Sequence, residues 1–328
     1  MEENKKFPSE LRMDIVSKDW GVIATGRAKK PGDFSKGKTK RKYKSARKCP
    51  FCDISTQKKP TAVFCDGKKI DFTDIIPKDW TTVSLPNKYP AFMRSEELND
   101  RFEGPLYKVM NAIGFHEVIV TRDHKKQIAD FEKGRVKELF DAYQDRYLAM
   151  KDQRFVNYIA IFHNYGLVAG ASMEHNHSQI ISTPLIDSDL RGALFSAKEY
   201  LDTNKKCIYC EMNKWEKESG QRIVYENKSF MAMCPFASKT AFEVIISPKN
   251  HLPYFEKITE EEKWDLADIF QTVIKKIYKG IGDPDYNFYL HTAPCDGESH
   301  DYYHWHFTIL PRTSNWAGFE IGTHMEIS

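Results

Sequence analysis

Two cysteine pairs with C-x-x-C spacing and two His-x-His pairs are the residues best suited to chemistry in this sequence. Thiolates two residues apart can hold one metal ion, and imidazoles from distant strands can complete the tetrahedron that is usual for structural zinc. Each half of the chain supplies such a set in the same order: Cys49, Cys52, His124 and His175, then Cys207, Cys210, His251 and His304. We therefore predict two metal sites with a structural role.

Other interpretations of these residues stay open at this stage. The cysteines could be small core residues and the histidines hydrogen-bonded polar groups. A redox role is also an alternative, although neither C-x-x-C pair opens a helix after a strand as thioredoxin-like motifs do. The metal of the second site could be zinc or iron. The odd total of seven cysteines argues against a disulfide framework.

The segment Ile161–Pro184 carries the groups suited to catalysis. Side chains alternate along a strand, so His175, His177 and Gln179 should share one face. If His175 binds the metal, His177 is fixed beside it, and Gln179 can donate a hydrogen bond to a phosphoryl oxygen. Neutral imidazole has a reference pKa of about 6.5 and is a competent nucleophile at phosphorus. We predict nucleotide transfer through a covalent bond to His177.

Two alternatives for His177 are a further metal ligand and an inert, packed histidine. Upstream of it, Gly170 and Ser172 would allow close backbone approach and supply donors to phosphate. In the second half Thr308 stands where Gln179 stands in the first. The second half is therefore expected to keep a metal site and to lack the nucleophile, with a role for His306 in substrate binding as the alternative.

An internal repeat positions these groups. Residues 114–147 can be laid over residues 240–278, and in both a short apolar run predicts a buried strand (Val118–Val120 and Val244–Ile246). A Phe-Glu-Lys sequence and a long amphipathic helix follow in both copies. Thr259 and Glu262 have capping-box spacing, which predicts a helix start near Thr259.

The separations between the predicted metal-binding histidines also nearly agree, since 175 − 124 is 51 residues and 304 − 251 is 53. We predict an α+β fold of tandem duplicated units, each an antiparallel sheet with a long helix. Residues 1–190 would carry the catalytic His-x-His-x-Gln and the first metal site, and residues 191–328 the second metal site.

Bulk properties restrict the classes of protein further. The 328 residues carry a net charge of only +3, which does not by itself indicate nucleic-acid binding. One basic run, Lys36–Lys48, has eight Lys or Arg among thirteen residues, and either a solvated loop or a nucleic-acid contact would explain it. No secretory signal and no run of about 18 apolar residues is present. We expect a cytoplasmic protein without a membrane span.

Six further segments match one known pattern: Gly26–Pro31, Cys49–Cys52, Asn87–Pro90, Gly170–Gln179, Pro235–His251 and Gly318–Thr323. In this combination the chain resembles the galactose-1-phosphate uridylyltransferase family of the histidine triad superfamily. Within this family the resemblance is strongest to the ADP-glucose phosphorylase branch. The resemblance runs from about Leu11 to the C-terminus. It implies histidine-triad-like units, zinc in two sites, and a nucleotide sugar with phosphate or a sugar 1-phosphate as the reactants. Homodimers are common in this family.

The resemblance also implies roles for single residues. His177 would accept the nucleotide, with Gln179 and Ser172 binding its phosphate. Asn87 and Asn164 would contact the nucleotide, and Arg27 and Lys30 would lie near the phosphates or the second substrate. The substrate site would further include Gly170, Ala171, Gly322 and Thr323.

Three positions depart from the uridylyltransferase pattern, which has Cys at Ala171, Asp at Lys88 and Tyr-Glu at Thr323-His324. These differences favour the phosphorylase branch, in which adenylyl is transferred to phosphate. The alternatives are uridylyl transfer between UDP-glucose and a hexose 1-phosphate, a zinc-dependent nucleic-acid-binding protein, and a hydrolase or nucleotide sensor of the same fold.

Overall fold

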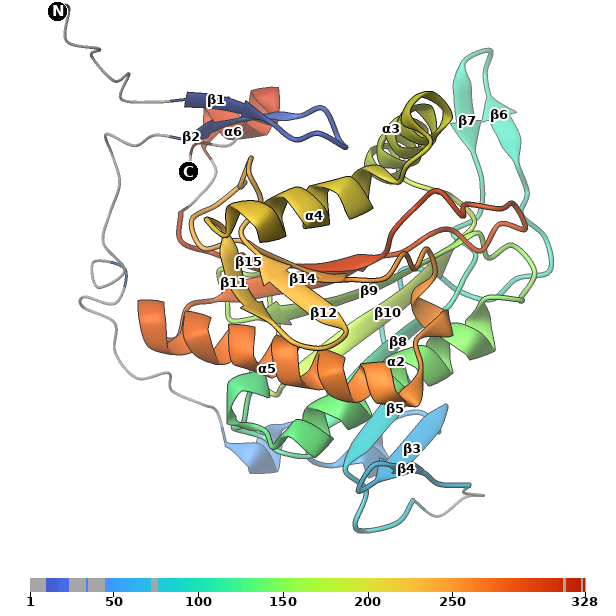
Figure 1. Ribbon diagram of the computed structural model, residues 1–328. Coiled ribbons are helices and arrows are strands. Elements are labelled where there is room, and N and C mark those ends of the chain that lie inside the picture. Colours follow the sequence, from blue (N-terminus) through green and yellow to red (C-terminus); the bar gives the residue numbers. More distant parts are fainter. Residues whose placement is uncertain are drawn as a thin grey trace, which may run out of the picture.

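One large antiparallel sheet dominates the computed structural model, which describes residues 10–23, 34, 45–71, 76–314, 317–325 and 327 (Figure 1). Arg27, Lys30 and most of the basic run Lys36–Lys48 lie outside the described residues. The eleven strands of the sheet follow in spatial order: β11 (Ile223–Glu226), β12 (Phe230–Met233), β13 (Val244–Pro248), β15 (His306–Pro311), β14 (Tyr286–His291), β9 (Tyr158–Tyr165), β10 (His177–Thr183), β8 (His116–Thr121), β5 (Thr82–Pro86), β3 (Ala62–Cys65) and β4 (Lys68–Lys69).

The predicted repeat is visible in this strand order. Outward from the β9–β14 pair, where Asn164 lies opposite Asn287, the two halves present equivalent strands: β10 and β15, β8 and β13, β5 and β12. The α+β fold with duplicated units is thus confirmed. The two units share one sheet, because β9 and β14 pair with each other and so leave no open edge between them.

The two long helices cover one face of the sheet (Figure 1). These helices, α2 (Lys133–Met150) and α5 (Glu260–Ile281), pack side by side, and aromatic rings from helix and strand meet beneath them, as Phe270 does with Phe288 and Phe307 at 4.9 and 5.4 Å. The predicted capping box is confirmed at Thr259, whose hydroxyl accepts a hydrogen bond from the Glu262 amide. A cap of this kind stabilises a helix by about 1 kcal/mol.

The opposite face is covered differently in the two halves. Over the second half lie α3 (Ser188–Asn204) and α4 (Ile208–Ser219), and over the first half lie Phe51 and η3 (Ile54–Thr56), which pack on β5 and β8. The proposed boundary between residues 190 and 191 falls within α3 and stays a prediction.

The remaining elements are short. The β1–β2 hairpin (Glu10–Met13 with Trp20–Ile23) lies beside α6 (Gly318–Thr323), and β6 (Arg101–Glu103) pairs with β7 (Tyr107–Val109). Three further 3-10 turns are η2 (Ala46–Lys48), η4 (Ile128–Asp130) and η5 (Phe255–Lys257). Within the described ranges, no helix is both long and apolar enough to cross a membrane.

Candidate active site and metal centres

The four residues predicted for the first metal site converge in the fold. Their ligand atoms lie within 4.8 Å of one another. His124 Nδ1 is 3.2 Å from Cys52 Sγ and 3.3 Å from His175 Nδ1, and Cys49 Sγ is 3.4 Å from His175 Nδ1. Zinc–sulfur bonds of about 2.3 Å and zinc–nitrogen bonds of about 2.0–2.1 Å imply tetrahedron edges of roughly 3.3–3.8 Å. The donor set therefore fits a tetrahedral zinc ion.

A backbone contact orients one of these ligands. His175 Nε2 donates to the Thr121 carbonyl oxygen at 2.6 Å, which places the remaining lone pair on Nδ1, the atom that faces the cysteines. Burial lowers the pKa of His175 to about 4, so its imidazole is neutral, as a metal ligand must be.

The second group repeats this arrangement. Cys210 Sγ lies 3.5 Å from His251 Nδ1 and 3.6 Å from His304 Nδ1, and Cys207 completes the set. The two histidines donate through Nε2 to the carbonyl oxygens of Asp301 and Pro248, at 2.6 and 3.0 Å. The same tautomer is thus imposed at both sites. Hydrogen bonds, first from Cys210 and then from both histidines, lower the pKa of the Cys207 thiol.

His177 is the first residue of β10 and is only 8% exposed. Its Nδ1 donates to the carbonyl oxygen of His175 at 2.8 Å, so the lone pair of the neutral ring is on Nε2, which has no partner within the described part of the chain. Burial is the main effect on the pKa of His177 and lowers it. The imidazole is therefore neutral near pH 7, with Nε2 available as a nucleophile.

The strand begins two residues later than the sequence suggests. His175 precedes β10, so alternation along the strand places only His177 and Gln179 on one face. The link between the first Cys₂His₂ group and His177 is instead the His175 carbonyl, together with Phe51 of the C-P-F-C segment. The Phe51 ring lies 5.1 Å from the His177 ring and 5.9 Å from the His175 ring.

Gln179 is held by a residue that sequence reasoning missed, His116 at the start of β8. The backbone amide of Ala91 donates to His116 Nδ1 at 3.1 Å, so the proton of the neutral ring is on Nε2. Nε2 then donates to Gln179 Oε1 at 2.9 Å. This fixes the side-chain amide of Gln179 with its NH₂ group free for a ligand. The only sequence signal was a polar residue directly before an apolar strand.

Asn87 meets the same imidazole. Its Nδ2 lies 3.0 Å from His116 Nε2, while its Oδ1 accepts from the Tyr89 amide at 2.9 Å. Because the proton on His116 Nε2 is donated to Gln179, this nitrogen cannot accept a hydrogen bond from Asn87. The amide hydrogens of Asn87 are therefore available to another acceptor. The structure thus brings Asn87 and Gln179 together around one ring, and both present donors.

Four further predicted residues lie at the end of β9 and in the loop that leads to β10. Asn164 accepts from Asn287 Nδ2 of the second half at 2.8 Å, and Asn287 also donates to the Ala169 carbonyl. Gly170 has a φ of +83°, a conformation that favours glycine, and Ala171 beside it is buried. Ser172 lines a cavity of about 390 Å³ beside Lys48, Cys49 and His175.

Gly322 and Thr323 lie elsewhere in the chain. They end α6, which lies beside the β1–β2 hairpin through the Val22–Ile327 bridge. The hairpin in turn contacts the second half, since Arg12 donates to the Phe236 carbonyl and Lys239 lies 3.9 Å from Asp19. The fold does not bring these two residues together with His177 of the same chain.

Family comparison agrees with this geometry. The N-terminal domain of galactose-1-phosphate uridyl transferase matches residues 1–186, and the C-terminal domain of the same family matches residues 158–325. Among curated relatives, ADP-glucose phosphorylase of Arabidopsis thaliana is 31% identical over 318 residues, which cover 96% of this chain and 87% of that protein. Galactose-1-phosphate uridylyltransferase of Thermotoga maritima is 26% identical and covers 92% and 86%.

Solved structures show the same relationship. An ADP-glucose phosphorylase from Arabidopsis thaliana with bound ADP-glucose superposes with a TM-score of 0.80 at 29% identity, covering 97% of this chain and 94% of that one. A uridylyltransferase structure superposes with a TM-score of 0.72 at 25% identity, covering 96% and 92%. Both similarities extend over nearly the whole chain.

Proposed function

The chain belongs to the galactose-1-phosphate uridyl transferase family, and on this premise we propose that it transfers adenylyl from ADP-glucose to phosphate through a covalent bond to His177. It is a nucleotidyltransferase that acts on nucleotide sugars. The observation that carries the covalent step is the buried, neutral His177 imidazole, whose Nδ1 proton is held by the His175 carbonyl and whose Nε2 lone pair is free.

In the first step His177 Nε2 attacks the α-phosphorus of the nucleoside diphosphate sugar. A nitrogen–phosphorus bond forms, the bond between this phosphorus and the bridging oxygen breaks, and the sugar 1-phosphate leaves with the electron pair of that bond. Such transfers depend on positioning and on neutralising charge at the phosphoryl oxygens. We propose that the NH₂ group of Gln179 and the hydroxyl of Ser172 donate to these oxygens.

In the second step an oxygen of inorganic phosphate attacks the same phosphorus. The nitrogen–phosphorus bond breaks, His177 returns to its neutral form, and a nucleoside diphosphate leaves. The His175 carbonyl stabilises the ring throughout, because its hydrogen bond from Nδ1 strengthens when Nε2 carries the positive charge of the intermediate.

Zinc in the two Cys₂His₂ groups would act structurally. In the first half it would be held by Cys49, Cys52, His124 and His175, and it would fix the His175 carbonyl that orients His177. Catalytic zinc sites keep one coordination position open for water or substrate, whereas each of these groups supplies four protein ligands and includes no carboxylate.

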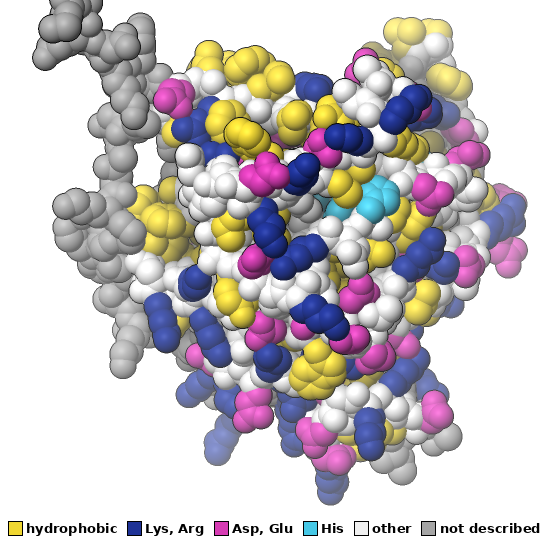
Figure 2. Space-filling view, in the orientation of Figure 1, with side chains coloured by type: hydrophobic (Ala, Val, Ile, Leu, Met, Phe, Trp, Pro, Cys, Tyr) yellow, Lys and Arg dark blue, Asp and Glu magenta, His cyan; other side chains and the backbone are white. Residues whose placement is uncertain are grey.

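Adenylyl rather than uridylyl transfer is favoured by two observations. The Arabidopsis thaliana relative, which is 31% identical to this chain, is an ADP-glucose phosphorylase. The uridylyltransferase of Thermotoga maritima is 26% identical to this chain. The resemblance adds a second argument, since the uridylyltransferase pattern has Cys at the position of Ala171. A nucleic-acid-binding role gains no support from the face in Figure 2, where basic and acidic side chains of the described residues are interspersed.

A homodimer would explain the position of α6. If Gly322 and Thr323 contact substrate, they must reach the His177 of a second copy, because α6 lies beside the second half of its own chain. Exposed apolar side chains on this side of the molecule, Leu11 (63%), Trp20 (45%) and Ile321 (64%), are available for such a contact.

A product assay tests the proposed reaction. The purified protein is incubated with ADP-glucose or UDP-glucose, with phosphate or with a hexose 1-phosphate as acceptor. We expect ADP and glucose 1-phosphate from ADP-glucose and phosphate, and no turnover with His177→Ala. Preferential formation of UDP-galactose from UDP-glucose and galactose 1-phosphate would instead establish the uridylyltransferase, and release of AMP to water without acceptor would establish a hydrolase.

A further inference from the structure

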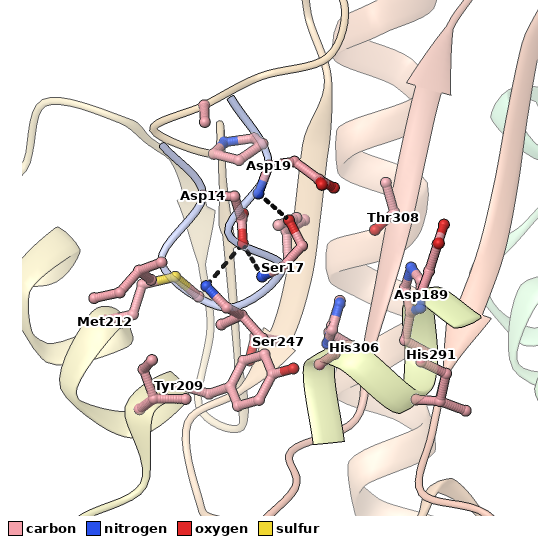
Figure 3. A pocket seen from close by; sticks show the side chains of 18 of the residues that line it. Asp14, Ser17, Asp19, Asp189, Tyr209, Met212, Ser247, His291, His306 and Thr308 are labelled. Carbon is pink, nitrogen blue, oxygen red and sulfur yellow. Dashed lines mark hydrogen bonds between the residues drawn. The ribbon is translucent and has the colours of Figure 1, made fainter. Parts of the chain in front are cut away.

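A second cavity, of about 920 Å³, lies over the second half of the sheet (Figure 3). Phe307 and Ile309 of β15 face α2 and α5, so the alternate residues His306 and Thr308 face away from these helices and into the cavity. Helix α4 and the turn between β1 and β2 form its walls. A volume of this size is typical of sites for small organic ligands.

The cavity lies on the side of the sheet that corresponds, in the first half, to the side on which His177 and Gln179 lie. His306 begins β15 as His177 begins β10, and its Nδ1 likewise donates to the carbonyl two residues earlier, at 3.1 Å. Thr308 lies opposite Tyr289 as Gln179 lies opposite Phe162. The backbone arrangement is therefore retained, while the side chains around it have changed.

These changes remove the donors that suit a phosphate. Thr308 replaces the Gln179 amide, and the register of β13 on β15 places the Glu243 carboxyl where His116 lies in the first half. The two cations that line the cavity are already paired: Arg222 with Glu216 at 2.9 Å, and Lys239 with Asp19 at 3.9 Å. Among the described residues, neither cation at the cavity is left unpaired for a phosphate group.

Several polar groups that line the cavity have no hydrogen-bond partner in the described part of the chain. Thr308 is only 4% exposed, yet its hydroxyl makes no hydrogen bond to any described residue, and the same holds for both ring nitrogens of His291. His306 Nε2 also lacks one. Thr308 is buried, whereas His291 and His306 are half-buried at the cavity surface, so these three side chains can form hydrogen bonds with a ligand that has several polar groups.

Seven described carboxylates line the cavity, and each already has a partner. Asp19 and Glu216 pair with Lys239 and Arg222, and Glu211 pairs with Lys206 at 3.3 Å. Asp189 accepts from the Ser188 hydroxyl, and Glu243 accepts from the Lys239 amide. Asp14 accepts hydrogen bonds from the Val16 and Ser17 amides at 2.9 and 2.7 Å (Figure 3), and Asp187 caps α3. A metal ion does not fit either. Over the described residues, only the two Cys₂His₂ groups bring three or more ligand atoms within 4.8 Å of one another. The His291 and His306 rings stack at 4.7 Å instead of converging.

Aromatic surface completes the site. Tyr209 is buried in the wall, and Trp215 and Phe236 at the cavity are 63% and 48% exposed. Flat aromatic faces pack well against the C–H faces of sugar rings, while sugar hydroxyls both donate and accept. We propose that this cavity binds an uncharged carbohydrate, whose hydroxyls meet Thr308, His291 and His306 and whose ring packs on Trp215.

The test is isothermal titration calorimetry of the full-length, metal-loaded protein with maltotriose, and separately with spermidine. Maltotriose should bind and spermidine should not. Thr308→Val keeps the shape but removes the hydroxyl, and it should weaken maltotriose binding about tenfold. Trp215→Ala should weaken it at least as much, while Trp264→Ala, an exposed tryptophan on α5, is the matched control and should bind as wild type. Nucleotidyl transfer should be unchanged in all three variants.

Each other outcome overturns the proposal. Absence of maltotriose binding, or binding that Thr308→Val and Trp215→Ala leave unchanged, would remove the carbohydrate from this cavity. Binding of spermidine that is lost in Thr308→Val would assign the cavity to a cation. The proposed transfer reaction is measured separately, so its failure would leave the binding result standing.

Discussion

At the scale of single residues, the chemistry depends on which nitrogen of each imidazole carries the proton. At His175, His177, His304 and His306 a backbone carbonyl decides this. The residue types and spacing were sufficient to predict the two Cys₂His₂ groups, and the role of His177 as a nucleophile stays a prediction. The tautomers were not predictable, because they depend on carbonyl groups that only the folded backbone brings into place.

His116 gives the sharpest test at this scale. In a Gln side chain the amide nitrogen can take the place of His116 Nε2 as the donor to Gln179. In an Asn side chain the amide oxygen can take only the place of Nδ1 as the acceptor from Ala91. Leu has neither group. We expect His116→Leu and His116→Asn to lower kcat roughly tenfold to hundredfold with little change in KM, because Gln179 loses its fixed orientation. His116→Gln should recover most of kcat.

The measurement is steady-state kinetics together with thermal unfolding of each variant. If kcat followed the melting temperature, or if Asn restored activity better than Gln, His116 would have a structural role only. His300, a hydrogen-bonded histidine outside the site, supplies the control substitution His300→Leu, which should leave kcat near that of the wild type.

Glu243 predicts a pH dependence of stability. Burial raises its pKa from 4.5 to about 7. A carboxyl with a raised folded-state pKa stabilises the fold while it is protonated, and this stability is lost as the pH rises from about 4.5 through about 7. As the pH rises from 5.5 to 8.5, the free energy of unfolding of Glu243→Gln should increase by about 2 kcal/mol relative to that of the wild type. Denaturant unfolding at both pH values checks this, and a constant difference between the two proteins would refute it.

At the scale of elements, the two metal groups tie loops to strands in the same way but serve different purposes. The first group contacts His177, the proposed nucleophile, through the His175 carbonyl and Phe51, whereas the second group lies in the half that has Thr308 in place of Gln179. The amphipathic helices, the capping box at Thr259 and the buried strands could be predicted because each depends on local sequence. The exact start of β10 could not, because His175 makes contacts with Cys49, His124 and the Thr121 carbonyl that only the fold brings together.

Substitution of one ligand per site separates these purposes. Cys52→Ser and Cys210→Ser should each reduce the zinc content from two ions to one per chain, measured by atomic emission, because three remaining ligands bind zinc weakly. Cys52→Ser should also abolish nucleotide transfer, whereas Cys210→Ser should retain it within about threefold under conditions where both fold. Unchanged metal content, or the opposite order of activities, would contradict the assignment.

At the scale of the whole molecule, the duplication produces one continuous sheet whose two halves carry different side chains at equivalent strand positions. The repeat was readable in the sequence, but the joining of its two copies through β9 and β14 was not, since strand pairing across halves leaves no local pattern. The position of α6 was equally hidden, because Gly322 and Thr323 were assigned by resemblance and not by contacts.

The homodimer predicts complementation between inactive chains. We expect His177→Ala and Ile321→Asp to be inactive alone, the first without a nucleophile and the second with α6 displaced. Mixing and reassembling them should restore up to about one quarter of the wild-type activity, because one kind of mixed dimer site is intact. A mixture as inactive as its components, with both variants folded, would show that α6 does not act on a partner's site.

The central claim is that His177 carries the nucleotide, and intact-protein mass spectrometry tests it most directly. The protein is incubated briefly with ADP-glucose in the absence of phosphate. We predict a mass increase of one AMP, absent from His177→Ala and discharged when phosphate is added. No adduct on the wild-type protein, although it converts ADP-glucose and phosphate to products, would contradict the covalent mechanism, and an adduct that persists in His177→Ala would place the nucleotide on another residue.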